Sequence, residues 1–182
     1  MSDTQTLTIA PAGTWELDAV HSAVGFEVEY LGGTFKGSFR ELDATLVVGD
    51  DAVSLEGSAK VASVDVKDEN LAGHLQSPDF FDAERYPEIS FTAKDVSLDG
   101  ETVQVEGDLT IKGVTHAADV TGTVTAPLTD PYGRERIGLQ LETRVDRTQF
   151  GVDWNNPLPN GEPALANDVT VVAELFFVKS PR

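Results

Sequence analysis

The sequence of 182 residues predicts an all-β protein with a single domain. Apolar and polar side chains alternate through most of the chain, which is the period of a half-buried strand. Turn-forming residues separate these runs, and one stretch near 68–83 breaks the alternation with helical spacing. About eight strands joined by short turns predict an antiparallel meander that closes into a barrel or folds as a sandwich.

The alternation begins after a polar N-terminal stretch. We expect the first strand near 24–30 and the second near 35–40, with Leu31-Gly32-Gly33 forming the turn between them. Charged and small polar side chains fall on one face of these strands, and the other face is apolar. The apolar positions are Val24, Phe26, Val28, Tyr30, Phe35 and Phe39.

Six further strands follow the same pattern. They are expected near 53–61, 89–93, 103–112, 114–126, 137–145 and 169–178. Asp99-Gly100 is a strong hairpin signal because both residues tolerate a positive φ, and Asn160-Gly161 predicts another turn. Phe91 faces inward by the same alternation. Closure would remove exposed edges and leave an interior that packed side chains or one slim ligand can fill.

The insertion near 68–83 has its own start signals. Asp68 can cap a helix in which Leu71 and Leu75 are four residues apart and share a face, with His74 nearby. Ser77-Pro78 is a second helix-start signal, which would present Phe80 and Phe81 on a very short turn. These apolar side chains need burial, so we expect the insertion to cover one end of the barrel.

Composition excludes several classes of partner. The chain carries 31 acidic and 13 basic residues, a net charge of −18, which disfavours nucleic acid and anionic lipid surfaces. No apolar window is long enough to span a membrane, and the N-terminus has no basic and apolar leader, so we expect a cytoplasmic protein. Residues 1–12 lack any period and are expected to form a disordered polar tail before a barrel domain at 13–180.

The sequence carries no pattern typical of catalysis. There are no cysteines, and His21, His74 and His116 are too far apart in the chain to form a zinc-binding motif. A nucleophile elbow and a glycine-rich phosphate loop are also missing. We therefore expect no enzyme activity, no metal and no cofactor. His21-Ser22 is expected to order a strand entrance by satisfying local backbone groups.

Four blocks of the chain resemble one family. They are WELDAVHSAVGFEVEYLGGTFKGSF at 15–39, HLQSPDFFDAERYPEISF at 74–91, GDLTIKGVTHAADV at 107–120 and DRTQFGVDWN at 146–155. In this order they are similar to the YceI-like family of polyisoprenoid-binding proteins. The resemblance implies an eight-stranded lipocalin-like barrel with a lengthwise apolar tunnel for an isoprenoid, quinone-like or fatty-acyl chain. It also implies a homodimer, and related proteins are often exported.

The chain departs from the family pattern near the expected head-group end. Leu71-Ala72 replace a common Arg-Asp pair, and Tyr30 stands where a histidine is frequent. Burying a diphosphate without a cation is costly, so a neutral or weakly polar head group is expected. The predicted apolar lining and lid comprise Phe26, Val28, Tyr30, Phe35, Phe39, Leu71, His74, Leu75, Phe80, Phe81, Phe91 and Trp154.

Two functions remain open from the sequence. The first is non-catalytic carriage, storage or sequestration of one long hydrophobic molecule inside the barrel. The second is an interaction module with a solid core that acts through its surface or a dimer face, for example in a stress response. The inward phenylalanines line a pocket in the first case and form only a core in the second.

Overall fold

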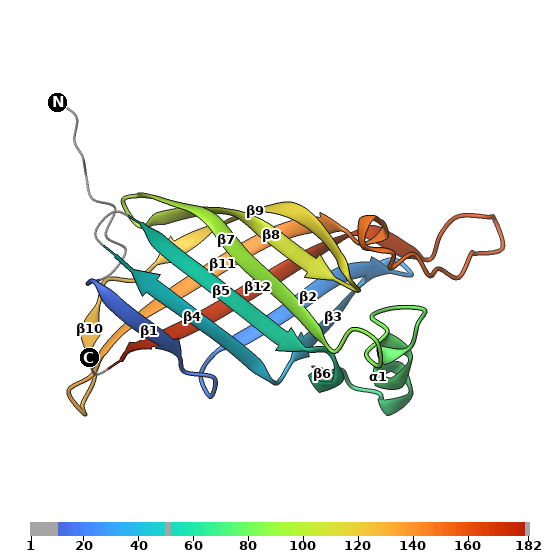
Figure 1. The fold of residues 1–182 in the computed structure, drawn as a ribbon. Helices are drawn as coiled ribbons and strands as arrows, with labels where there is room; N and C mark the ends of the chain where they lie inside the picture. Colours follow the sequence, from blue (N-terminus) through green and yellow to red (C-terminus); the bar gives the residue numbers. More distant parts are fainter. Residues whose placement is uncertain (1–10, 50–51, 181–182) are drawn as a thin grey trace.

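Eight antiparallel strands close into a barrel, as the sequence predicts (Figure 1). The computed structural model describes residues 11–49 and 52–180, so most of the expected polar tail lies outside the described residues. Neighbours in the chain are neighbours in the barrel, which makes it an up-and-down meander. Six of its strands are continuous: β5 (Val53–Lys60), β7 (Glu88–Asp99), β8 (Thr102–Ile111), β9 (Val114–Val124), β11 (Glu135–Asp146) and β12 (Leu165–Lys179).

The first two strands of the barrel are each broken in the middle. The first consists of β1 (Gly13–Leu17) and β2 (Ala23–Tyr30), which lie one after the other along the same edge of β12. The second consists of β3 (Gly33–Phe39) and β4 (Leu42–Val48), which pair with β2 and β1 respectively. The predicted strands near 24–30 and 35–40 are therefore the lid-end halves of two longer strands.

The break between β1 and β2 is held by local hydrogen bonds. The hydroxyl of Ser22 donates to the carbonyl of Asp18 (2.8 Å) and accepts from the N–H of Phe176 on β12 (2.9 Å). The expected role of Ser22 at a strand entrance is thus confirmed. His21 differs from the expectation, because Nδ1 contacts the carboxylate of Asp18 at 2.7 Å instead of a backbone group.

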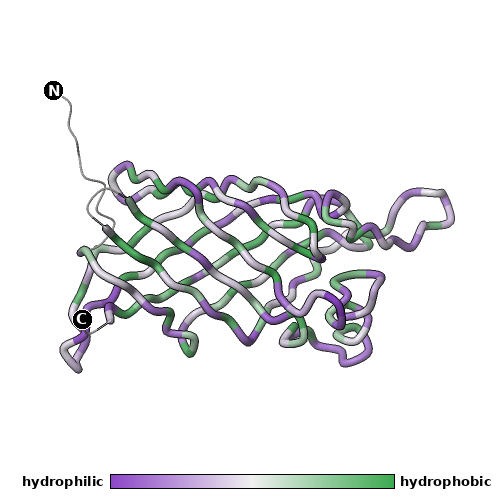
Figure 2. The backbone as a smooth tube through the Cα atoms, in the orientation of Figure 1, coloured by the Kyte–Doolittle hydropathy of each residue, from purple (hydrophilic) through white to green (hydrophobic). Residues whose placement is uncertain are grey.

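The half of the barrel that contains β1 and β4 is solid. Buried and exposed residues alternate along strands such as β4 and β8, and hydrophobic and hydrophilic residues are interspersed along the backbone (Figure 2). Trp15 and Phe177 are fully buried at its centre, and Leu46, Val103 and Ile137 pack around them. This packing blocks the barrel axis at that end.

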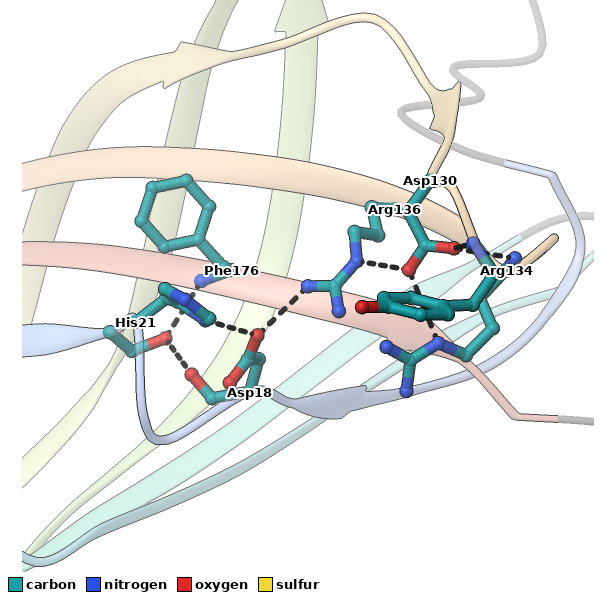
Figure 3. A network of polar contacts seen from close by, with 8 residues as sticks. Asp18, His21, Asp130, Arg134, Arg136 and Phe176 are labelled. Atoms are coloured by element: carbon teal, nitrogen blue, oxygen red, sulfur yellow. Dashed lines mark hydrogen bonds and ion pairs between the residues drawn. The ribbon is translucent and has the colours of Figure 1, made fainter.

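An ion-pair network fastens the same end from outside (Figure 3). Arg136 on β11 donates from Nη1 to Asp18 (2.8 Å) and from Nε to Asp130 (2.7 Å). Asp130 also accepts from the backbone N–H groups of Tyr132 and Arg134. These hydrogen bonds hold the pKa of Asp18 at about 2, below its ordinary value of 3.8, and lower the pKa of Asp130 as well.

At the opposite end the strands separate. On the edge away from β2, β3 pairs with the short strand β6 (Val64–Asp65) and not with β5. β9 and β11 pair only over 121–124 and 139–142 within the described residues. The first opening is filled by the segment 61–87, which carries the helix α1 (Glu69–Gln76). The second is filled by the 3₁₀ helix η2 (Arg147–Phe150). The remaining short elements are the 3₁₀ helix η1 (Val61–Ser63) and the strand β10 (Leu128–Thr129).

The predicted turns match the structure. Leu31 and Gly32 have φ of 52° and 83° between β2 and β3, which is the backbone of a tight hairpin. Gly100 has φ of 63° between β7 and β8. None of the helices within the described ranges is long and apolar enough to cross a lipid bilayer.

Candidate ligand-binding cavity

A cavity of about 290 Å³ lies inside the barrel at the end that α1 covers. Its wall is almost entirely apolar and comes from the strands, from α1 and the residues after it, and from η2 and the loop that follows it. A second cavity of about 150 Å³ continues toward the middle of the barrel. The residues that border both cavities are Val24, Ala59, Ile89, Leu109 and Val171. This half of the barrel is therefore hollow.

The size of the main cavity suits a single hydrocarbon chain. An apolar cavity of about 150 Å³ holds benzene, so about 290 Å³ has room for roughly a dozen carbon atoms. Small-molecule sites start at about 300 Å³ and are mostly apolar with a few polar groups. The smaller cavity adds depth along the barrel axis, and beyond it lies the solid half.

Helix α1 forms the first part of the lid. It begins after Asp68, whose carboxylate accepts from the N–H of Asn70 (2.8 Å), as the sequence predicts. Leu71, His74 and Leu75 follow at i, i+3 and i+4, so they share one helix face, and all three line the cavity. The helix face that the spacing predicts is therefore the face that closes the barrel.

The residues after α1 fold back under it without forming a second helix. Ser77, expected to start one, instead ends α1, and its hydroxyl donates to the carbonyl of His74 (2.6 Å). The N–H groups of Phe80 and Asp82 both donate to the Ser77 carbonyl (3.0 and 2.9 Å). This tight turn buries Phe80 and brings the neighbouring Phe81 to the cavity wall.

Aromatic rings line the side of the cavity nearest β2 and β3. The ring of Phe26 lies 6.0 Å from Phe35 and 5.8 Å from Phe39, between centroids. Phe81 from the lid meets Phe26 and Phe39 edge to face, at 6.5 and 5.8 Å. A Cβ atom at Gly37 would lie 2.5 Å from the ring of Phe26, so glycine at that position gives the ring its place.

Three further aromatic rings line the cavity where the lid meets the loop after η2. His74 of α1 lies 4.9 Å from Phe80 and 5.0 Å from Trp154, edge to face in both cases. Phe80 and Trp154 are 5.3 Å apart. Trp154 belongs to the long loop after η2, so this cluster joins the lid to that loop. We call His74, Phe80 and Trp154 the aromatic cover.

The lid is also fastened to the turn between β8 and β9. Lys112 donates from Nζ to the carbonyl of Pro78 (2.6 Å) and to that of Gly151 (3.2 Å). Tyr86 packs over Gly113, where an added Cβ would lie 2.6 Å from the Tyr86 ring. Gly113 has φ of 77°, which also favours glycine. These contacts hold the β8–β9 side of the lid to the barrel.

Arg147 is the one permanently charged residue among the described residues that line the cavity. Its guanidinium donates to four backbone carbonyls on the two legs of the loop after η2: Ala166 from Nε, Val152 and Trp154 from Nη1, and Leu165 from Nη2. The distances are 2.8 Å for the first three and 3.3 Å for Leu165. Burial lowers the pKa of Arg147, against the opposing effect of the charges of Asp146 and Asp153.

Eleven of the twelve predicted lining residues meet at this cavity; Phe91 is the exception and borders the smaller, deeper one. Four further residues line the cavity that no motif in the sequence had marked as lining residues: Arg147, Phe150, Val152 and Leu165. The first three lie in the block at 146–155, which resembles the family pattern. That resemblance did not assign these three residues to the cavity lining. Alternation along the predicted strand near 169–178 places Val169 and Val171 on one face, and both line the cavity.

The three histidines lie in separate surroundings. His21 contacts Asp18 at the solid end, His74 contacts Asp79 on the lid, and His116 contacts the carbonyl of Gln149 at η2. Within the described ranges, histidine and acidic side chains form no group of three that could hold a metal ion.

Comparisons with known proteins agree with this architecture. The YceI-like domain model matches residues 15–177. The UPF0312 protein SERP2314 of Staphylococcus epidermidis is 31% identical over 172 residues, which cover 90% of this chain and 96% of that protein. The crystal structure of Burkholderia cenocepacia BcnA has a TM-score of 0.76 at 22% identity, over 88% of this chain and 98% of that chain.

A second solved structure is a polyisoprenoid binding domain from Saccharophagus degradans implicated in plant cell wall breakdown. It has a TM-score of 0.71 at 17% identity, over 91% of this chain and 98% of that chain. The two structures show the same barrel fold, and the domain model covers almost the whole described chain. The protein therefore belongs to the YceI-like family, as the four sequence blocks indicated.

Proposed function

We propose that this protein binds the chain of one long hydrophobic molecule inside the lid half of the barrel and carries, stores or sequesters it without catalysis. One observation carries the proposal: an apolar cavity of about 290 Å³ under a lid, with a second cavity leading deeper. The resemblance of the fold to a polyisoprenoid binding domain supports it. The ligand classes are a polyisoprenoid, an isoprenoid quinone or a fatty-acyl compound.

The solid half of the barrel gives the ligand a direction. Trp15 and Phe177 block the axis, so the chain enters tail first from the lid end and its head group stays near the lid. Transfer of hydrocarbon from water contributes about 0.8 kcal/mol per CH₂, and much of that sum offsets the entropy lost on association. The eleven predicted residues at the main cavity contact the upper chain, and Phe91 contacts the tail.

The test is native mass spectrometry of freshly purified protein, with organic extraction to identify any bound lipid. We expect a stoichiometric apolar molecule. Val171→Trp would fill the junction of the two cavities, so this variant should purify empty. The control is Val172→Trp, because the adjacent residue on β12 lies on the outer face of the barrel.

Two results would speak against binding in the cavity. The first is an empty wild-type protein whose melting temperature does not rise when isoprenoids or fatty acids are added. The second is equal lipid content in the Val171→Trp and Val172→Trp variants, which would place the bound molecule outside the barrel.

A further inference from the structure

Arg147 has a charge that its own contacts do not neutralise. Its four acceptors are backbone carbonyls, which are uncharged. The carboxylate of Asp146 is engaged by the N–H and hydroxyl of Thr148, and Asp153 is exposed. No acidic side chain among the described residues forms an ion pair with Arg147. A buried cation without an anion is costly, so an anion in the cavity would be favoured.

One donor of Arg147 also remains free. A guanidinium has five N–H groups, and four of them account for the carbonyl contacts. The fifth, on Nη2, has no acceptor among the residues that the structure describes. Arg147 is 6% exposed and lines the cavity, and its Nη1 donates to the carbonyl of Trp154, a member of the aromatic cover.

The cavity therefore has a polar side and an apolar depth. The polar side consists of Arg147 and His74, both in contact with Trp154. The aromatic wall of Phe26, Phe35 and Phe39 lies across β2 and β3, and the path to the smaller cavity is bordered by aliphatic side chains. A single-chain amphiphile would match this arrangement with its head at Arg147 and its tail toward the middle of the barrel.

We propose that the ligand is a single-chain carboxylic acid, of fatty-acyl or isoprenoid type, whose carboxylate accepts a hydrogen bond from Nη2 of Arg147. This inference rests on the proposed function. A carboxylate fits better than a diphosphate, because one free N–H and one histidine cannot satisfy the many oxygen atoms of a diphosphate. It replaces the neutral head group expected from positions 71–72, since the cation comes from a different part of the chain.

The first experiment compares matched ligands on the delipidated full-length protein. Dodecanoate and dodecanol have the same chain length and differ in the head group, and their Kd values can be measured by displacement of a fluorescent fatty acid at pH 7.5. We expect the wild type to prefer dodecanoate by about tenfold. Arg147→Gln should remove the preference. Arg144→Gln, which removes an exposed arginine from the same region of the chain, should keep it.

The second experiment needs no variant. It tests whether a cation lies beside the bound carboxylate even if Arg147→Gln fails to fold. Dodecanoate labelled with ¹³C at the carboxyl carbon is titrated with pH while bound to the wild type. A neighbouring guanidinium should lower the carboxyl pKa relative to the same acid bound to a carrier without a cation. Apolar burial alone raises the pKa of a bound carboxyl group. A carboxyl pKa as high as that of the same acid bound to the carrier without a cation would therefore overturn the inference.

The outcomes separate the two proposals. If neither ligand binds, the proposed function fails and the head-group inference fails with it. Equal binding of dodecanoate and dodecanol by the wild type leaves the proposed function standing and rejects the carboxylate. A preference that survives in Arg147→Gln also rejects Arg147 as the anchor and assigns the preference to another group, such as His74.

Discussion

Arg147 holds Trp154 in place through a 2.8 Å hydrogen bond from Nη1 to the Trp154 carbonyl. The same guanidinium bonds Leu165 and Ala166 on the other leg of the loop, so one buried side chain sets the shape of the loop base. The indole of Trp154 then meets His74 on the lid. The position of the aromatic cover thus depends on a cation within the cavity wall.

Loss of the indole should speed ligand release. Trp154→Ala removes the ring that contacts both His74 and Phe80, which opens the polar side of the cavity to water. We expect the dissociation rate of a bound fatty acid to rise about tenfold, with a smaller change in the association rate. Stopped-flow displacement measures both rates.

Leu158→Ala is the control for this variant, because Leu158 lies in the same loop and does not line the cavity. Similar rates for the two variants would mean that the loop as a whole, and not the indole, retains the ligand.

The junction between the two cavities should determine the chain length that fits. Ala59 borders both cavities and is buried, so Ala59→Phe would separate the smaller cavity from the larger one. We expect the affinity for a 16-carbon acid to fall by more than tenfold, whereas a 10-carbon acid should lose threefold or less. Calorimetry of the chain-length series gives the comparison. An equal loss for both acids would show that the tail does not pass this point.

The strand order and the lid could be predicted because their signals are local. Alternating side chains identify strands whichever partner they take, and the eight predicted runs correspond one to one with the eight strands of the barrel. Phe80 and Phe81 predicted a lid because large aromatic side chains beside a capped helix need burial. Periodicity alone was compatible with either a barrel or a sandwich. The resemblance of the four sequence blocks to the family predicted the closed barrel.

The role of Arg147 could not be predicted in this way. Its acceptors include carbonyls 18 and 19 residues further along the chain, so its burial depends on how the loop returns to β12. The break in the first strand likewise depends on a distant contact, because the hydroxyl of Ser22 accepts a hydrogen bond from Phe176 across 154 residues. An arginine after an apolar strand is normally expected at the surface, and only the assembled loop makes it part of the cavity wall.

The lid should loosen when its contact with the β8–β9 turn is disturbed. Gly113→Ala places a methyl group 2.6 Å from the Tyr86 ring, and the residue has a positive φ that alanine tolerates poorly. Gly100→Ala is a matched control, since Gly100 also has a positive φ but no neighbour within 4 Å. Each should lose about 1 kcal/mol of unfolding free energy through the backbone.

Only Gly113→Ala should also raise hydrogen exchange in α1 and in residues 77–87, because only there does the methyl group push against the lid. Exchange measured by mass spectrometry on both variants provides the test. Unchanged protection of the lid in Gly113→Ala would mean that Tyr86 moves aside without releasing it.

The ion-pair network at the solid end should make stability depend on acid pH. The pKa of Asp18 is about 2 in the folded protein against an ordinary 3.8, chiefly because Arg136 donates to its carboxylate. A lowered folded-state pKa means that the stabilisation is fully present above about pH 4 and is lost as the pH falls toward 2. The difference in urea midpoint between the wild type and Asp18→Asn should therefore be largest at pH 5 and shrink steadily down to pH 2.

Asp119→Asn removes an exposed carboxylate outside this network, and the difference between that variant and the wild type should show no such trend. The network lies at the solid end of the barrel, so Asp18→Asn should leave the affinity for dodecanoate unchanged at pH 7.5. A midpoint difference for Asp18→Asn that stays constant from pH 5 to pH 2 would show that Arg136 does not stabilise the ionised carboxylate. A change in affinity at pH 7.5 would show instead that the solid end and the cavity are coupled through the strands that they share.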